Sequence, residues 1–127
     1  MTKSIIVAID EQDKASFNRI LDSLDPNLCM VKIGSVSFNT LGHDIIYSAA
    51  DKGFDIFLDL KLHDIPNTVK KSIEGLSNLP IQMLTIHTSG GRLMMECAME
   101  AIKGTDIKVF GVTALTCLLY TSDAADE

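Results

Sequence analysis

The chain has 127 residues, of which 46% are hydrophobic and 22% are charged, and its net charge is −6. This length predicts one domain or part of one, and the composition is that of a globular protein. No apolar run reaches the roughly 18 residues of a membrane-spanning helix, no basic stripe indicates nucleic-acid binding, and no His/Cys cluster has zinc-ligand spacing. The short N-terminal apolar run resembles a first strand rather than a signal peptide, so we expect a cytoplasmic protein without membrane or nucleic-acid partners.

Apolar runs of strand type alternate with apolar stripes of helical spacing along the chain. In chain order we predict a strand at 4–9, a helix around 17–24, a strand at 28–33, a helix around 38–49, a strand at 54–60, a helix at 66–76, a strand at 81–86, a helix around 94–101 and a strand at 107–112. Such alternation predicts a parallel sheet, either in a doubly wound fold or in a (β/α)8 barrel. No GxGxxG or GxxxxGK[ST] motif follows any strand, so the doubly wound nucleotide-binding folds lack their usual signature.

Polar side chains stand at the carboxyl end of each predicted strand, whereas the strand interiors are almost wholly apolar. These residues are Asp10, Lys32, Asp59 with Lys61, His87, and Thr113 with Thr116. In a barrel these strand ends form one rim, where catalytic residues collect. A helix cap explains Asp10 alone equally well, but the same pattern on five successive strands favours a functional rim.

The sequence DLKLHDIPNT at residues 59–68 carries the densest charge on this rim. Residues i and i+2 of a strand face the same way, so Asp59 and Lys61 are expected to point into one site. Asp64 falls in the loop before the Pro66 helix start, and Thr68 falls in the first helical turn, where free N–H groups can meet an anion. We expect the carboxylates to favour the protonated lysine, which can then donate a proton to a developing carbanion. A surface ion-pair network is the structural alternative.

The same ten residues resemble the signature of the orotidine 5'-phosphate decarboxylases. IIVAID, MVKIG, LTIHTSGG and VFGVTALT resemble the family's first, second, fourth and fifth strands, so the resemblance covers residues 4–116. It implies an α/β fold, a TIM (β/α)8 barrel truncated after about the fifth strand. Residues 1–116 would be the N-terminal part of the decarboxylase domain, and residues 117–127 are expected to be a non-native tail.

The resemblance also implies a chemistry: the decarboxylation of orotidine 5'-phosphate to UMP in pyrimidine biosynthesis, without metal or organic cofactor. Lys61 would protonate the ring carbon, Asp59 would lie near the departing carboxylate, and Asp64 would complete the catalytic set from the neighbouring subunit of a homodimer. Binding residues would be Asp10 at the ribose, Lys32 in the charged network, Ile65, Thr68 across the dimer interface, and Thr116 at the pyrimidine. His87 would support the rim.

Two rival hypotheses stay open. Decarboxylases and aldolases of sugar phosphates share the D-x-K-x-x-D arrangement of Asp59, Lys61 and Asp64, but they bind magnesium and lack the HDIPNT continuation at residues 63–68. The second rival hypothesis is a non-catalytic half-barrel that acts through interactions alone. The family's phosphate-binding arginine and last loops have no counterpart here, because Arg19 and Arg92 fall within helix patterns. Because binding energy at a remote phosphate drives catalysis, we expect this polypeptide alone to be inactive or nearly so.

Overall fold

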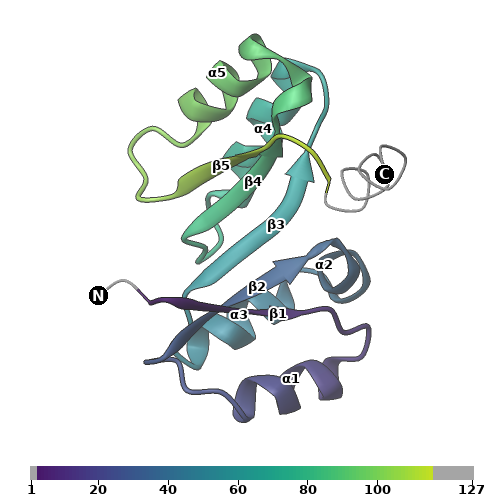
Figure 1. The fold of residues 1–127 in the computed structure, drawn as a ribbon, viewed down its shortest axis with the longest axis vertical. Helices are drawn as coiled ribbons and strands as arrows, with labels where there is room; N and C mark the ends of the chain where they lie inside the picture. The colour runs from purple at the N-terminus through teal and green to yellow at the C-terminus, as the bar shows by residue number, and fades with distance from the viewer. Residues whose placement is uncertain (1–2, 116–127) are drawn as a thin grey trace, which may run out of the picture.

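The computed structural model describes residues 3–115, which form a five-stranded sheet and its covering helices (Figure 1). The strands are β1 (Ile5–Ile9), β2 (Cys29–Gly34), β3 (Ile56–Leu62), β4 (Met83–His87) and β5 (Lys108–Val112). The helices are α1 (Lys14–Asp22), α2 (Ser35–Leu41), α3 (Asp44–Asp51), α4 (Pro66–Leu76) and α5 (Arg92–Ala101), with a 3-10 turn η1 (Thr88–Gly90) after β4.

Every strand pairs in parallel with the strand that follows it in the chain, in the order β1-β2-β3-β4-β5. A doubly wound sheet contains a point where the strand order reverses, and the sheet of residues 3–115 contains none. Sequential order with one helical crossover after another is the arrangement of a barrel wall. The predicted parallel sheet is therefore confirmed, and the barrel is favoured over the doubly wound alternative.

One apolar core lies between the helices and one face of the sheet. The strands contribute alternate residues to it, as the two-residue period of a strand requires, and the helices contribute residues three or four apart. Its fully buried members include Val31 and Ile33 of β2, Ile56 and Leu58 of β3, Phe17 and Leu21 of α1, Ile45 and Ala49 of α3, Val69 and Ile73 of α4, and Met94 and Ala98 of α5. The four helices α1, α3, α4 and α5 thus pack on the same face of the sheet.

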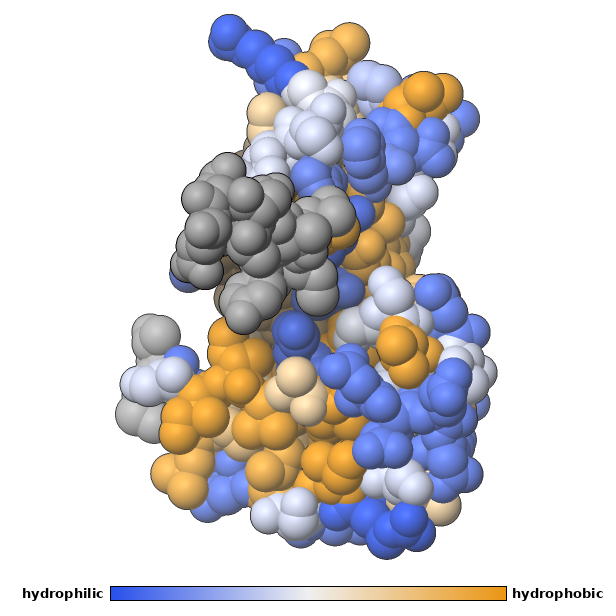
Figure 2. Space-filling model, turned by 45° about the vertical axis from the view of Figure 1, so that its right-hand side comes forward, coloured by the Kyte–Doolittle hydropathy of each residue, from blue (hydrophilic) through white to orange (hydrophobic). Residues whose placement is uncertain are grey.

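The opposite face of the sheet carries side chains that helices do not cover. Ile6 of β1 and Phe110 of β5, which alternate with the core-facing residues of their strands, are each nearly half exposed. Figure 2 shows apolar side chains gathered on the surface in the lower half of the molecule, the half that contains β1 and β2. None of the helices at residues 3–115 is long and apolar enough to cross a membrane.

The helix expected around residues 38–49 is in fact two helices, so this prediction was wrong in number. Gly42, with φ of 71°, ends α2, and α3 begins at Asp44. A positive φ is open to glycine because it has no Cβ. Strand boundaries also differ: β3 begins at Ile56 rather than at residue 54, because the Phe54 N–H still bonds the Ala49 carbonyl at 3.1 Å in the preceding turn.

Candidate active site

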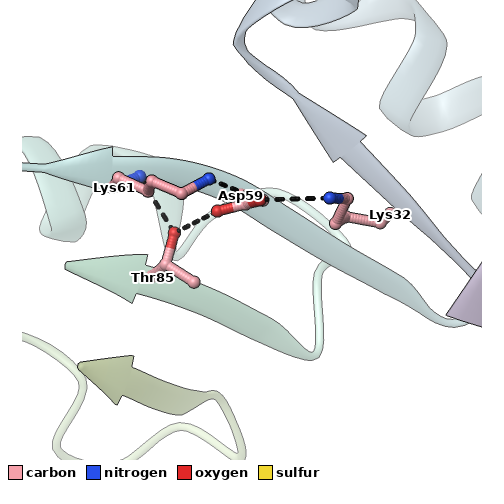
Figure 3. Close-up of polar contacts among 4 residues, drawn as sticks. All are labelled: Lys32, Asp59, Lys61 and Thr85. Atoms are coloured by element: carbon pink, nitrogen blue, oxygen red, sulfur yellow. Dashed lines mark hydrogen bonds and ion pairs between the residues drawn. The ribbon is translucent and has the colours of Figure 1, made fainter. Parts of the chain in front are cut away.

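Parallel strands in sequential order bring the carboxyl ends of β1 to β5 to one edge of the sheet. Asp59 of β3 lies at the centre of a charged cluster there, which Figure 3 shows with its three partners. Its Oδ2 lies 2.8 Å from the Lys61 Nζ and 3.4 Å from the Lys32 Nζ of β2. Its Oδ1 accepts a hydrogen bond of 2.8 Å from the Thr85 hydroxyl of β4. Three neighbouring strands therefore supply one cluster, which we call the Asp59 cluster: Lys32, Asp59, Lys61 and Thr85.

Asp59 is a buried carboxylate, with only 8% of its surface exposed. Burial on its own raises the pKa of a carboxyl group because it penalises the charged form. The hydrogen bonds from Lys61 and Thr85, together with the charges of Lys61 and Lys32, outweigh burial and lower the pKa of Asp59 below its ordinary value. At neutral pH the cluster thus holds an ionised carboxylate between two lysine side chains.

The backbone of Lys61 is unusual. Its φ is 49°, and among residues 3–115 no other non-glycine residue has a positive φ. Between the pairs Leu58–Leu84 and Leu62–Ile86, β3 contains two more residues than β4, so the ladder is interrupted by a bulge. Bulges occur next to active sites, where they re-aim a side chain. Asp59 and Lys61 do point into one site as predicted, but through a bulge rather than through regular alternation.

Thr85 was not predicted as a site residue. Its hydroxyl donates to Asp59 and also accepts the Lys61 N–H at 2.9 Å. The only signal in the sequence was a polar residue between the apolar Leu84 and Ile86 of a predicted strand. That signal is weak, because a threonine inside a strand is ordinary.

Asp10 follows β1 at the same edge of the sheet. Its Oδ1 lies 3.4 Å from the position that a Cβ on Gly34 would occupy, and the Asp59 carbonyl oxygen lies 3.7 Å from it. The absence of a side chain at Gly34 therefore leaves room for Asp10 beside the Asp59 cluster. The segment around Asp10 is held by Ser37 of α2, whose buried hydroxyl accepts the Glu11 N–H at 2.7 Å and lies 2.7 Å from the Glu11 carbonyl oxygen.

Asp64 and its neighbours lie outside the Asp59 cluster. Two carboxylates were expected to flank Lys61, but only Asp59 does so in this chain, and Asp64 forms no ion pair with any residue in 3–115. Because Asp64 stands in the loop between β3 and α4, its Oδ1 turns to accept the Ile65 N–H at 2.7 Å. Thr68 is exposed in the first turn of α4. A cavity of about 450 Å³ adjoins this loop and is lined by His63, Asp64, Ile65, Pro66, Ser89 and Gly90.

His87, expected to support the rim, bonds and stacks with its neighbours there. Its Nδ1 accepts the Ser89 N–H at 3.2 Å, and its ring stacks on that of His63 with centroids 5.4 Å apart.

Thr116, expected at the pyrimidine, lies outside the described residues. Within residues 3–115 no group of three or more His, Cys, Asp or Glu side chains is placed to hold a metal ion.

The fold and the cluster define a class: a (β/α)8-barrel segment with lysines and a buried carboxylate at the carboxyl ends of its strands. The family described as Orotidine 5'-phosphate decarboxylase / HUMPS family matches residues 3–119, so the chain belongs to this family. The resemblance seen in the sequence is thereby confirmed.

Curated relatives agree with this assignment. The orotidine 5'-phosphate decarboxylase of Saccharophagus degradans is 42% identical over 116 residues, which are 90% of this chain and 49% of the relative. That of Actinobacillus succinogenes is 40% identical over 121 residues, 93% of this chain and 52% of the relative. The chain thus spans about half the length of the curated relatives it matches, and those relatives are named orotidine 5'-phosphate decarboxylases.

Solved structures support the same fold. The chain superposes on the orotidine 5'-phosphate decarboxylase of Lactobacillus acidophilus with a TM-score of 0.83 and 35% identity, covering 96% of this chain and 59% of that one. For the Thermotoga maritima enzyme the TM-score is 0.74 and the identity 29%, over 99% of this chain and 64% of that one. The predicted barrel fold is confirmed for the part that the chain shares with them.

Proposed function

We propose that this protein acts in the decarboxylation of orotidine 5'-phosphate to UMP, with Lys61 as the proton donor. The observation that carries the proposal is the Asp59 cluster, a buried ionised carboxylate bonded to two lysines at the catalytic edge of the sheet. The family and the curated relatives supply the reaction and the substrate. The roles of Lys61 and Asp59 below are argued from this geometry, and those of the other site residues from the resemblance to the family.

The proposed step breaks one carbon–carbon bond and forms one carbon–hydrogen bond. The bond from the pyrimidine ring to its carboxylate breaks, carbon dioxide leaves, and the electron pair stays on the ring carbon. The Lys61 ammonium gives a proton to that carbon, and the neutral amine left behind regains a proton from water. General acid catalysis of this kind requires a donor held at the reacting atom, which is what the 2.8 Å bond to Asp59 provides for the Lys61 side chain.

Asp59 has two proposed effects. Its negative charge crowds the substrate carboxylate and loses that repulsion as carbon dioxide departs, and it fixes the Lys61 ammonium beside the developing carbanion. Because the size of ground-state repulsion is contested, we assign the larger share to electrostatic stabilisation of the transition state by Lys61 and Lys32. Both effects require an ionised Asp59, in keeping with its lowered pKa.

The remaining site residues divide between this chain and a second copy. Asp10 is proposed to bind the ribose, and Thr116 the pyrimidine. Asp64, Ile65 and Thr68 are proposed to act across a homodimer interface. In support, Ile65 is 66% exposed although it is apolar, and the Asp64 carboxylate bonds the Ile65 N–H and forms no ion pair within residues 3–115. A cytoplasmic location stays a prediction from the sequence.

A chimera tests the proposal most directly. Residues 1–115 would precede the remaining half of the Saccharophagus degradans relative, and the loss of orotidine 5'-phosphate would be followed spectrophotometrically. We expect turnover, and a loss of at least about 10²-fold in Lys61→Ala, the lower end of the range for general acid catalysis. Lys71→Ala, which removes an exposed lysine of α4, is the matched control and should retain the parental rate.

Each outcome of the assay distinguishes between the proposed function and its rival hypotheses. Equal rates for the parent and Lys61→Ala would remove Lys61 from the mechanism. A folded chimera without turnover would favour the non-catalytic hypothesis. The sugar-phosphate hypothesis predicts that activity needs magnesium, so turnover unchanged by EDTA counts against it. The 127-residue chain assayed beside the chimera is expected to be inactive or nearly so.

A further inference from the structure

We propose that Thr85 is a positioning residue that orients the Asp59 carboxylate and the Lys61 backbone through one hydroxyl group. The importance of this role for catalysis rests on the proposed function, whereas the positioning itself is a property of the folded chain. The inference begins with the setting of Thr85. It stands in β4 between the buried Leu84 and Ile86, and it is only 3% exposed.

A buried hydroxyl needs hydrogen-bond partners, because none are available from bulk water. The Thr85 Oγ1 has two of them, and they differ in kind. It donates its single hydrogen to the Asp59 Oδ1 at 2.8 Å and accepts the Lys61 N–H at 2.9 Å (Figure 3). The orientation of the hydroxyl is therefore fixed, since the carboxylate can only accept and the N–H can only donate.

The bulge in β3 explains why the Lys61 N–H needs this partner. In a regular ladder a strand N–H bonds a carbonyl of the adjacent strand, but β3 carries two more residues than β4 between Leu58 and Leu62. The Lys61 N–H bonds the Thr85 side chain instead. A side chain on β4 thus takes the place of a backbone acceptor at the residue whose φ is 49°.

The two bonds are coupled because they share one oxygen. An N–H that donates to a hydroxyl polarises it, and the polarised hydroxyl becomes a better donor to the carboxylate. The charged groups facing Asp59 are Lys61 on its own strand and Lys32 on β2, while Asp10 stands beside Gly34. Thr85 is the neutral member of the Asp59 cluster, so substituting it changes the hydrogen bonds of Asp59 without changing the charges of Lys61 and Lys32.

Two substitutions isolate the hydroxyl. Thr85→Val keeps the branched shape and removes both the donor and the acceptor, whereas Thr85→Ser keeps both. Two properties would be measured by NMR on the 127-residue chain: the pH titration of the Asp59 side-chain carboxyl carbon, assigned with Asp59→Asn, and hydrogen exchange at the Lys61 amide. Thr88→Val, which removes a hydroxyl that bonds the Val112 carbonyl at 3.0 Å on the same rim, is the control.

In Thr85→Val we expect a higher Asp59 pKa than in the parent and a Lys61 amide that exchanges roughly five- to tenfold faster, the factor for one lost hydrogen bond. Thr85→Ser and Thr88→Val should match the parent in both measurements. A Thr85→Val protein with the parental pKa and exchange rate would overturn the inference. If Thr85→Val does not fold, a Lys61 amide unprotected in the parent would overturn it equally well. Neither measurement needs turnover, so an inactive chimera would refute the proposed function and leave this inference standing.

Discussion

The left-handed backbone of Lys61 makes a prediction about stability that separates the backbone from the side chain. With φ of 49°, its Cβ lies close to the following carbonyl oxygen, which costs about 1–2 kcal/mol for any residue other than glycine. Lys61→Ala retains this cost and Lys61→Gly removes it. Glycine gives back about 0.5–1 kcal/mol through the greater freedom of its unfolded chain. We therefore predict that Lys61→Gly is more stable than Lys61→Ala by about 1 kcal/mol.

Urea unfolding followed by circular dichroism measures this difference. Both variants lose the ion pair with Asp59, so that loss cancels in the comparison. The same pair of substitutions at Lys108, an exposed residue of β5 whose φ is not positive, is the control. There the sign should reverse, with glycine less stable by about 0.5–1 kcal/mol. Equal stabilities at position 61, or a more stable alanine variant, would refute the claim that the lysine is held in a strained conformation.

Two further predictions concern Asp59 and Ser37. Because the folded-state pKa of Asp59 is lowered, the unfolded chain takes up its proton first as the pH falls, so its contribution is complete above about pH 4 and is lost as the pH falls through the folded pKa. The free energy of unfolding should thus decrease more steeply below about pH 4 in the parent than in Asp59→Asn, and parallel curves there would contradict this. Ser37→Ala should cost about 1–3 kcal/mol in urea unfolding, because the Glu11 N–H loses its acceptor. A cost near zero would mean that water replaces the hydroxyl.

Local pattern predicted the order of strands and helices because each element here buries one face against one core. β2 is a nearly continuous apolar run and α4 begins at a proline, and both elements were placed close to their observed positions. The division into α2 and α3 was missed because Phe38, Leu41 and Ile45 keep the helical spacing across the break. Gly42 was the available signal, but a single glycine within a helical pattern is often tolerated.

The candidate site was predicted where neighbours in sequence are also neighbours in space. Asp59 and Lys61 are two residues apart, so their pairing was predicted from spacing, although the bulge that produces it was not. Thr85 and Ser37 were missed because each bonds partners 24 or more positions away, which no local pattern records. Asp64 was placed in the loop after β3, as observed, but its spacing could not show that its carboxylate accepts the Ile65 N–H rather than flanking Lys61.

The sequential order of the sheet also bears on how the chain folds. Each strand from β2 to β5 pairs with the strand that precedes it in the chain. No strand of residues 3–115 has to wait for a partner that comes later than the next one. Such a topology requires less loop closure at each step than a sheet whose strands pair with more distant segments of the chain. The strands of this sheet can therefore pair one after another, starting from the N-terminus, as the chain is synthesised.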